Sequence, residues 1–300
     1  MAKYANPAAL EMAVKAAAAK SSAETGRAVT SFYFHRLLCH VFASENSTFI
    51  LKGGQALLAR TPEARATRDI DLLSLQSDID SALSELIKLV ETDLGDFITF
   101  EFAEARPFKV NEEYRSGISV RFTPILGAKR MQTIAIDLVV DDVDFEEPEI
   151  VSPAGRLQVD GLETRDYRVY PVENALADKL CALLERHEGK PSSRVKDLVD
   201  IAVYARTCAI DGSKLQAVIK REASVRHITL PESFQIPEEW GQPQEKQYEK
   251  MWLQTGLPES LKTVRGAVKL AEALLSPAVK MRLGKMTWKP ALLQWEKKVS

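Results

Sequence analysis

The spacing of apolar residues changes near residue 170, and this change predicts two structural parts. Residues 78–92 place apolar side chains at helical spacing. Runs rich in Ile, Val, Phe and Thr, which are typical of strands, cover residues 97–110, 117–126 and 131–141. Beyond residue 170 the pattern turns helical. We therefore predict a mixed α/β part over residues 1–168 and a helical part over residues 169–300.

Helical spacing also covers much of the remaining chain. It predicts helices at residues 7–20, 24–44, 171–188, 192–208, 213–228, 246–274 and 289–298. The segment 142–170 contains Pro148, Pro153 and Gly155, and we predict a connector with a short hairpin there. Residues 231–245, rich in Pro, Glu and Gln, are predicted to form a loop.

The stretch from Phe49 to Ser74 combines two patterns that carry chemistry. An apolar run leads into Lys52, Gly53 and Gly54, and a short apolar-periodic segment follows. After a loop rich in Thr, Pro and Arg comes a second apolar run. This order predicts strand, glycine turn, short helix, loop and strand. Two glycines at the start of a helix let the backbone approach a phosphate closely.

The second apolar run contains two aspartates, Asp69 and Asp71. Residues two apart on a strand point to the same face, so the two carboxylates repel each other unless a cation neutralises them. A sparse carboxylate set completed by water and phosphates suits Mg²⁺, with Mn²⁺ as the alternative. Asp137 interrupts the apolar strand 131–141, the placement expected for a third ligand on the strand next to that of Asp69 and Asp71. The alternative is a strand-end aspartate paired with a nearby arginine.

The helical part contains a second group of charged residues. Lys179 flanks the predicted buried stripe of its helix and is well placed to neutralise a triphosphate, or alternatively extends its ammonium into solvent. Arg194, Asp197 and Asp200 follow at i, i+3 and i+6 of the next helix. Surface pairing explains Arg194 with Asp197. Two acids directed toward Lys179 are harder to explain in this way, and Asp197 is a candidate to orient the lysine.

Composition narrows the class of protein. The chain of 300 residues is 45% hydrophobic and 27% charged, as in globular proteins, and lacks an apolar run of roughly 20 residues that a membrane span needs. The N-terminus carries charges where a secretory signal would be apolar, which predicts a cytoplasmic protein. Residues 259–300 contain nine Lys or Arg and three Glu, a net charge of +6 in a chain of −2. This asymmetry suggests an anionic partner such as RNA, although a solvated helix face explains it equally well.

Four short motifs together resemble the AbiEii-type nucleotidyltransferase toxins of bacterial abortive-infection and toxin–antitoxin systems. The motifs are Lys52-Gly53-Gly54, Thr67-Arg68-Asp69-Ile70-Asp71, Lys179-Leu180-Cys181-Ala182 and Arg194-Val195-Lys196-Asp197-Leu198-Val199-Asp200. The resemblance spans roughly residues 49–206. It implies a DNA-polymerase-β-like nucleotidyltransferase core with a mixed sheet, followed by a helical domain that completes the site for a nucleoside triphosphate (NTP).

The resemblance also implies roles for individual residues. Asp69 and Asp71 would bind the metal, Gly53 and Gly54 the phosphates, and Lys179 the triphosphate, while Asp197 would complete the site. Lys52, Arg68 and Arg194 are candidates to contact the nucleotide, although Lys52 and Arg68 have local acids as alternative partners. The job of the arginine-bearing loop, residues 60–68, is left open by the motifs.

The function implied is transfer of nucleotides from NTP to the 3′ end of tRNA, which blocks translation, under the restraint of a cognate antitoxin. We expect no DNA or membrane partner. Alternatives are a nucleotidyltransferase acting on a small molecule or a protein side chain, and a non-catalytic NTP-binding regulator.

Overall fold

The computed structural model describes residues 4–21, 24–44, 46–108, 115–141 and 147–298. The chain divides into two compact units. The sheet unit contains Met1–Arg60, Thr67–Asp144 and Pro148–Val169; the helical unit contains Thr61–Ala66, Phe145–Glu147 and Tyr170–Ser300. The loop Thr61–Ala66 therefore belongs to the helical unit, although the residues on both sides of it belong to the sheet unit.

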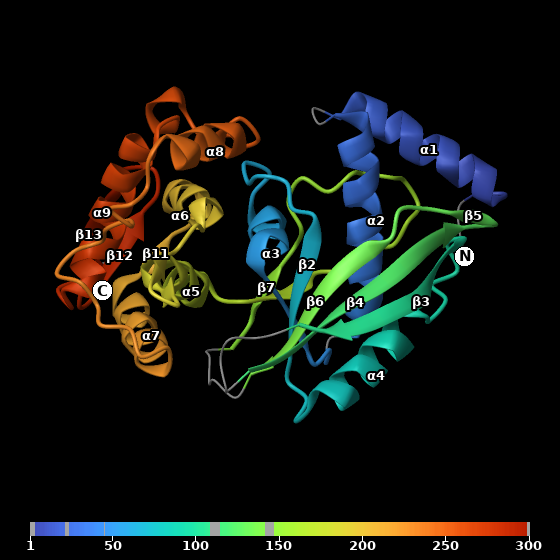
Figure 1. The fold of residues 1–300 in the computed structure, drawn as a ribbon. Helices are drawn as coiled ribbons and strands as arrows, with labels where there is room; N and C mark the ends of the chain where they lie inside the picture. Colours follow the sequence, from blue (N-terminus) through green and yellow to red (C-terminus); the bar gives the residue numbers. More distant parts are fainter. Residues whose placement is uncertain (1–3, 22–23, 45, 109–114, 142–146, 299–300) are drawn as a thin grey trace. The chain divides into compact units, whose positions relative to one another are not determined.

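The sheet unit alternates helices and strands in its first half and continues with strands (Figure 1). Its helices are α1 (Pro7–Lys20), α2 (Thr25–Val41), α3 (Gly53–Arg60) and α4 (Ile79–Val90). Its strands are β1 (Phe49–Lys52), β2 (Asp69–Ser74), β3 (Ile98–Pro107), β4 (Arg115–Leu126), β5 (Lys129–Arg130), β6 (Ile134–Asp141), β7 (Glu149–Val151) and β8 (Tyr167–Val169). The predicted order of strand, glycine turn, helix, loop and strand over residues 49–74 is confirmed.

These strands form one mixed sheet in the order β3-β4-β6-β2-β1-β8-β7, with β5 paired to β4. Strand β2 pairs in parallel with β6 and antiparallel with β1. The β1–β8 pair is also parallel, and β7 and β8 pair antiparallel as the predicted hairpin of the connector. The fold is thus a mixed α/β fold in which the aspartate-bearing strands β2 and β6 are central neighbours.

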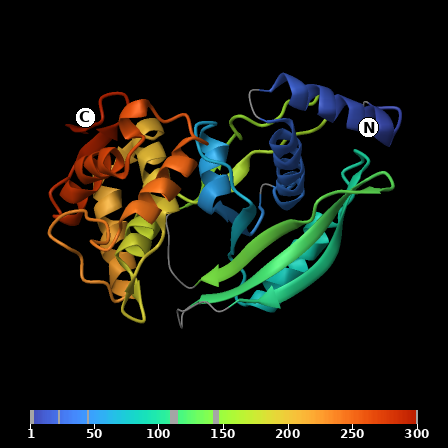
Figure 2. The same ribbon diagram turned by 45° about the horizontal axis from the view of Figure 1, so that its top comes forward.

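Alternation along β2 and β6 places the aspartates on the face opposite a fully apolar one. Ile70 and Leu72 on β2, like Ile136 and Leu138 on β6, are buried in one core with side chains of α2 and α4. Because adjacent strand residues point to opposite faces, the intervening aspartates lie on the other face. In Figure 2, α4 lies behind β3, β4 and β6, so the view shows the face opposite this helix.

The helical unit is built around two almost completely buried helices, α5 (Val172–Leu184) and α6 (Val195–Thr207). Around them are α7 (Gly212–Val225), α8 (Gln242–Trp252), a 3-10 turn (Glu259–Leu261) and α9 (Val264–Val279). Five short strands also belong here: β9 (Arg186–His187), β10 (Lys190–Pro191), β11 (Ile210–Asp211), β12 (Met286–Lys289) and β13 (Gln294–Lys297). A helix buried all round needs apolar residues on every side, which explains the dense apolar sequence of α5 and α6.

Two predicted helices of this unit are interrupted. The helix predicted over 171–188 ends at Leu184, because Arg186–His187 turns back and pairs with Lys190–Pro191. The helix predicted over 246–274 is two helices, α8 and α9, separated by a segment that contains Gly256 and Pro258. Proline lacks the amide hydrogen that a helix interior requires, so the break at this position is expected on local grounds.

The helix predicted over 289–298 is wrong, because this segment belongs to the β12–β13 hairpin. Trp288 and Trp295 face each other across the two strands, with ring centroids 5.6 Å apart. The Trp288 side chain is fully buried and its indole N–H donates to the Ala205 carbonyl at 2.7 Å. Burial of Trp288 and its contact with Trp295 outweigh the helical spacing of the sequence.

Candidate active site

The acidic face of the sheet unit brings together all three aspartates that the sequence singled out. In the β2–β6 pair, Asp71 is opposite Asp137, and Asp69 is two residues along β2 on the same face. Neighbouring strands lie roughly 4.8 Å apart, so Asp71 and Asp137 are direct neighbours. The expected placement of Asp137 beside the Asp69/Asp71 strand is confirmed. All three side chains are half-buried. We call these residues the acidic face.

Strand β1 places a cation, Lys52, beside the acidic face. Lys52 is the register partner of Asp71, and partners in a strand pair share a face. This position beside an acid fits the local-partner alternative for Lys52. Arg68, in the loop just before β2, is exposed and makes no ion pair with any residue that the structure describes. Its contact with phosphate stays a prediction.

Position 53, at the start of α3, requires glycine because the Asp71 carboxylate lies where a side chain would be. Its φ is +63°, and a Cβ at this position would lie 1.8 Å from Asp71 Oδ2. Any side chain here would therefore displace the carboxylate, besides straining the backbone. The close approach that the sequence assigned to a phosphate is made here by the Asp71 carboxylate. The phosphate contacts of Gly53 and Gly54 stay predictions.

The donor chemistry of the acidic face fits a magnesium site that is open rather than closed. Among the described residues, no group of three or more His, Cys, Asp or Glu is arranged to enclose a metal ion. Two aspartates on one strand face with a third beside them supply few oxygen ligands, as Mg²⁺ sites do when water and phosphate oxygens complete the coordination. Magnesium binding by Asp69, Asp71 and Asp137 remains a prediction.

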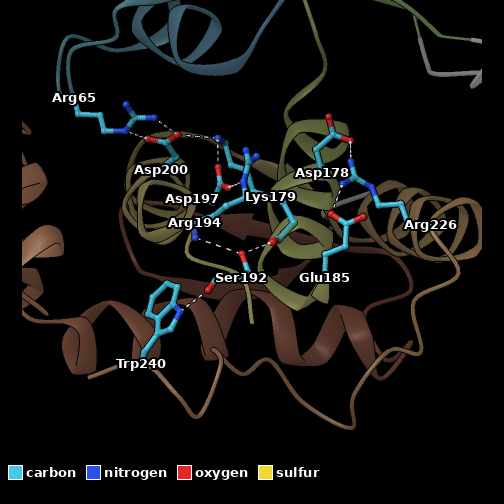
Figure 3. A network of polar contacts seen from close by, with 11 residues as sticks. Arg65, Asp178, Lys179, Glu185, Ser192, Arg194, Asp197, Asp200, Arg226 and Trp240 are labelled. Carbon is cyan, nitrogen blue, oxygen red and sulfur yellow. Dashed lines mark hydrogen bonds and ion pairs between the residues drawn. The ribbon is translucent and has the colours of Figure 1, made fainter. Parts of the chain in front are cut away.

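The helical unit holds a buried cluster of charged side chains around Lys179 (Figure 3). Lys179 Nζ lies 2.8 Å from Asp200 Oδ2 and 3.2 Å from Asp197 Oδ1. Lys179 is 8% exposed and both aspartates are 1% exposed. The expectation that the two acids of α6 point toward Lys179 is confirmed, and the solvent-extended alternative for this lysine is wrong.

Each aspartate of this cluster also pairs with an arginine. Arg194, at the N-terminal end of α6, pairs with Asp197 through its Nε, as surface pairing at i, i+3 predicted. Arg65 donates two hydrogen bonds to Asp200, Nε to Oδ1 at 2.9 Å and Nη2 to Oδ2 at 3.0 Å. We call Arg65, Lys179, Arg194, Asp197 and Asp200 the Lys179 cluster. Its formal charge is +1.

The cluster shifts the pKa values of two of its members, Lys179 and Asp197. Burial disfavours the charged form of Lys179, but the attraction of Asp200 and Asp197 outweighs burial and raises the lysine pKa above its ordinary value. Burial likewise disfavours ionised Asp197, but Lys179 and Arg194 together lower its pKa. Lys179 is therefore an ammonium and Asp197 a carboxylate at neutral pH.

A second set of hydrogen bonds fixes the turn that carries Arg194. Ser192 Oγ donates to the Ala182 carbonyl of α5 at 2.7 Å and accepts from Arg194 N at 3.3 Å. The Trp240 indole N–H donates to the Ser192 carbonyl at 2.7 Å, as Figure 3 shows. Packed α5 thus positions both Lys179 and the start of α6.

A model of one protein family matches residues 36–270, described as "Nucleotidyl transferase AbiEii toxin, Type IV TA system". The match covers most of the chain, including the acidic face and the Lys179 cluster. The chain belongs to the AbiEii family. It is thus a nucleotidyltransferase toxin of a toxin–antitoxin system, a class that implies an NTP substrate and a cognate antitoxin. No curated protein matches this AbiEii-family chain.

Three solved structures are similar to this chain at low sequence identity. MenT4, a nucleotidyltransferase toxin from Mycobacterium tuberculosis, is 13% identical over 95% of this chain and 99% of its own, with a TM-score of 0.48. JHP933 from Helicobacter pylori is 14% identical over 86% and 94%, with a TM-score of 0.44. A putative nucleotidyltransferase from H. pylori is 15% identical over 86% and 97%, with a TM-score of 0.42.

None of the described helices is long and apolar enough to cross a membrane.

The sequence analysis did not predict the pairing of Arg65 with Asp200, which are 135 residues apart. The only signal for it in this AbiEii-family sequence is the run of arginines in the loop before Asp69.

Proposed function

We propose that this AbiEii-family protein transfers a nucleotide from NTP to the 3′ end of tRNA, with Mg²⁺ held by Asp69 and Asp71. The observation that carries the proposal is the β2–β6 register, which places Asp71 beside Asp137 and on the same face as Asp69. In the proposed architecture the sheet unit is a polymerase-β-like nucleotidyltransferase core, and the helical unit completes the NTP site.

The proposed reaction is an in-line displacement at the α-phosphorus. The oxygen of the acceptor hydroxyl forms a bond to the α-phosphorus, the bond to the β-phosphate bridging oxygen breaks, and pyrophosphate leaves while the hydroxyl proton is lost. Bound Mg²⁺ would supply charge neutralisation and polarise the phosphate. The protein's task is mainly positioning, so the rigid alternation of β2 and β6 suits it.

The Lys179 cluster supports the triphosphate side of the proposal. Lys179 is held between two aspartates and keeps its positive charge, and the cluster retains a formal charge of +1. Such a fixed ammonium suits a triphosphate because no reorganisation is needed when the anion binds. Asp197 orients Lys179, and Arg194, Lys52 and Arg68 are proposed to add phosphate contacts, with the backbone at Gly53 and Gly54.

An exposed basic surface supports RNA as the acceptor. Lys298 N donates to the Lys285 carbonyl at 3.0 Å, and Lys297 is opposite Met286 in the β12–β13 hairpin, so the backbones of the two lysine-bearing strand ends are neighbours. Lys280 and Arg282 precede this hairpin in the turn after α9. The four side chains Lys280, Arg282, Lys285 and Lys297 are exposed and make no ion pair with any described residue. Uncompensated cations of this kind bind phosphate backbones.

Transfer of label from NTP to tRNA tests the proposed function. The protein is incubated with total tRNA, Mg²⁺ and each of the four NTPs labelled at the α-phosphate. We expect label in tRNA with at least one nucleotide and none with Asp69→Ala. Label on protein or on a small molecule instead of tRNA supports the alternative acceptors. NTP binding without any labelled product supports the regulator.

Charge removal tests the basic surface separately. Changing Lys280, Arg282 and Lys285 to Gln is expected to raise the KM for tRNA about tenfold and to reduce its salt dependence, with the KM for NTP unchanged. A matched control changes three exposed lysines elsewhere in the helical unit, Lys220, Lys246 and Lys250. An equal effect of both triple variants would remove the basic surface from the proposal.

A further inference from the structure

The loop Thr61–Ala66, which belongs to the helical unit, contacts the rest of that unit at two points. Gly256 N donates to the Glu63 carbonyl at 2.9 Å, and a Cβ on Gly256 would lie 2.8 Å from Glu63 Cγ. Arg65 makes the second attachment, to Asp200 of α6. The chain then continues to Asp69, four residues after Arg65. A loop whose role the sequence left open is thus held by specific contacts.

Arg65 meets Asp200 in the bidentate geometry that arginine forms with carboxylates. The two hydrogen bonds have the ordinary lengths of 2.9 and 3.0 Å, and the side chains of Arg65 and Asp200 are 13% and 1% exposed. The planar guanidinium matches the carboxylate in a way that an ammonium cannot. Asp200 also accepts from Lys179 Nζ at 2.8 Å, so one carboxylate serves two cations.

Each carboxylate of the Lys179 cluster has its own guanidinium partner, and the lysine contacts both carboxylates. Asp197 has the guanidinium of Arg194, Asp200 has the guanidinium of Arg65, and Lys179 bridges both carboxylates as the cation in excess. Without Arg65 the cluster would have no net charge, and Asp200 would depend on Lys179 alone. Arg65 therefore decides whether a positive charge remains for an anionic ligand.

We propose that Arg65 is a positioning residue for the nucleotide: by neutralising Asp200 it keeps the Lys179 ammonium available to the triphosphate. This inference rests on the proposed function, in which Lys179 contacts NTP. Arg65 acts through Asp200 and Lys179 and is not itself assigned to the reacting atoms. A purely structural anchor for the loop would lower stability but would leave nucleotide affinity unchanged in the folded protein.

The experiment measures labelling kinetics and thermal unfolding of four full-length variants. Arg65→Gln is expected to raise the KM for NTP about tenfold, the order of losing one fixed charge near a polyanion, with kcat changed less than about threefold. Arg65→Lys, which keeps the charge, should raise KM less. Asp200→Asn added to Arg65→Gln restores the +1 cluster and should return KM most of the way to wild type.

Arg226→Gln is the matched control. Arg226 is a second buried arginine of the helical unit, paired with Glu222, Glu185 and Asp178. Its loss should lower the unfolding temperature without changing the KM for NTP. Assays run below the unfolding temperature of every variant.

Two outcomes overturn the inference: an unchanged KM in Arg65→Gln, or a raised KM that Asp200→Asn does not rescue. Should Arg65→Gln fail to fold, Arg65→Lys and the double variant still report on the charge. If wild type labels no acceptor, the proposed function fails, and NTP binding measured by calorimetry on the same variants tests the Arg65 inference independently.

Discussion

The acidic face of the sheet unit and the Lys179 cluster of the helical unit use aspartates in opposite ways. On the acidic face the carboxylates are half-buried, and Asp69 makes no ion pair with any residue that the structure describes. In the Lys179 cluster both aspartates are 1% exposed and each contacts Lys179 and one arginine. The carboxylates of the acidic face are thus half-exposed, whereas those of the Lys179 cluster are buried and paired with cations of the same unit.

The difference matches the role proposed for each region. A partly exposed carboxylate pair is satisfied by a cation that binds from outside, whereas buried carboxylates need partners built into the fold. The half-exposed acidic face is thus compatible with the proposed metal, which would bind together with its substrate. In the cluster the buried aspartates hold the Lys179 ammonium in a fixed position. Substitutions on the two regions should therefore differ, with catalysis lost from the first and both stability and nucleotide affinity lost from the second.

The largest expected effect is on the acidic face. Asp71→Asn should lower labelling activity about 10³-fold or more, because a proposed metal ligand and its charge are lost, while the unfolding temperature changes little. Radiolabel transfer and thermal unfolding measure the two effects. Glu101→Gln, which removes an exposed acid of β3 paired with Arg130, is the control and should retain activity. Near-normal activity of Asp71→Asn would contradict the metal assignment.

Lys179→Met is expected to lower both stability and activity. It leaves two buried aspartates with one cation fewer, and breaking a buried ion pair in this way costs about 3 kcal/mol or more of unfolding free energy. Activity at a temperature where the variant is folded should fall about 100-fold, by analogy with other fixed donors to developing charge. Lys220→Met, at an exposed site, is the control. Denaturant unfolding that shows no loss would mean that the cluster is not coupled to stability.

Gly53→Ala tests how Asp71 is positioned. The φ of +63° costs an L-residue about 1 kcal/mol, and the added methyl would also displace the Asp71 carboxylate. Gly95→Ala is a matched control because Gly95 has a φ of +72° and an added Cβ meets nothing within 4 Å. We expect both variants to lose similar stability to strain, but only Gly53→Ala to lose activity, about tenfold. Equal activity of the two would separate Gly53 from the acidic face.

The smallest expected effect is the pH dependence of the Lys179 cluster. The folded-state pKa of Asp197 is lowered, so its charge contributes stability that is present above its unfolded pKa of about 4 and is lost as pH falls through the folded value. The raised pKa of Lys179 contributes stability below about pH 10 that is lost only as pH rises through the folded value. The stability difference between wild type and Asp197→Asn should be constant from about pH 5 to 9 and shrink in acid. A difference independent of pH in acid would show that Asp197 is not coupled to its cations.

The local spacing of apolar residues was sufficient to predict most helices and strands of the sheet unit. Helices α1, α2 and α4 and strands β1, β2, β3, β4 and β6 lie where periodicity predicted them. It failed at the C-terminus, where residues 286–297 form a hairpin. Spacing alone does not distinguish a short amphipathic helix from a hairpin whose buried side chains include Trp288. The indole N–H groups of all four tryptophans donate to backbone carbonyls, so hydrogen bonds fix these side chains in the helical unit.

The sequence by itself determined that Asp69 and Asp71 share a face, because strand alternation is a property of neighbouring residues, and the four motifs indicated the family that the family comparison then established. Only the tertiary structure decided that Asp71 is beside Asp137, that its carboxylate occupies the space over Gly53, and that Arg65 pairs with Asp200. Register between distant strands and pairing across 135 residues depend on which apolar faces pack together. That choice is made by the whole core and is absent from any local stretch of the chain.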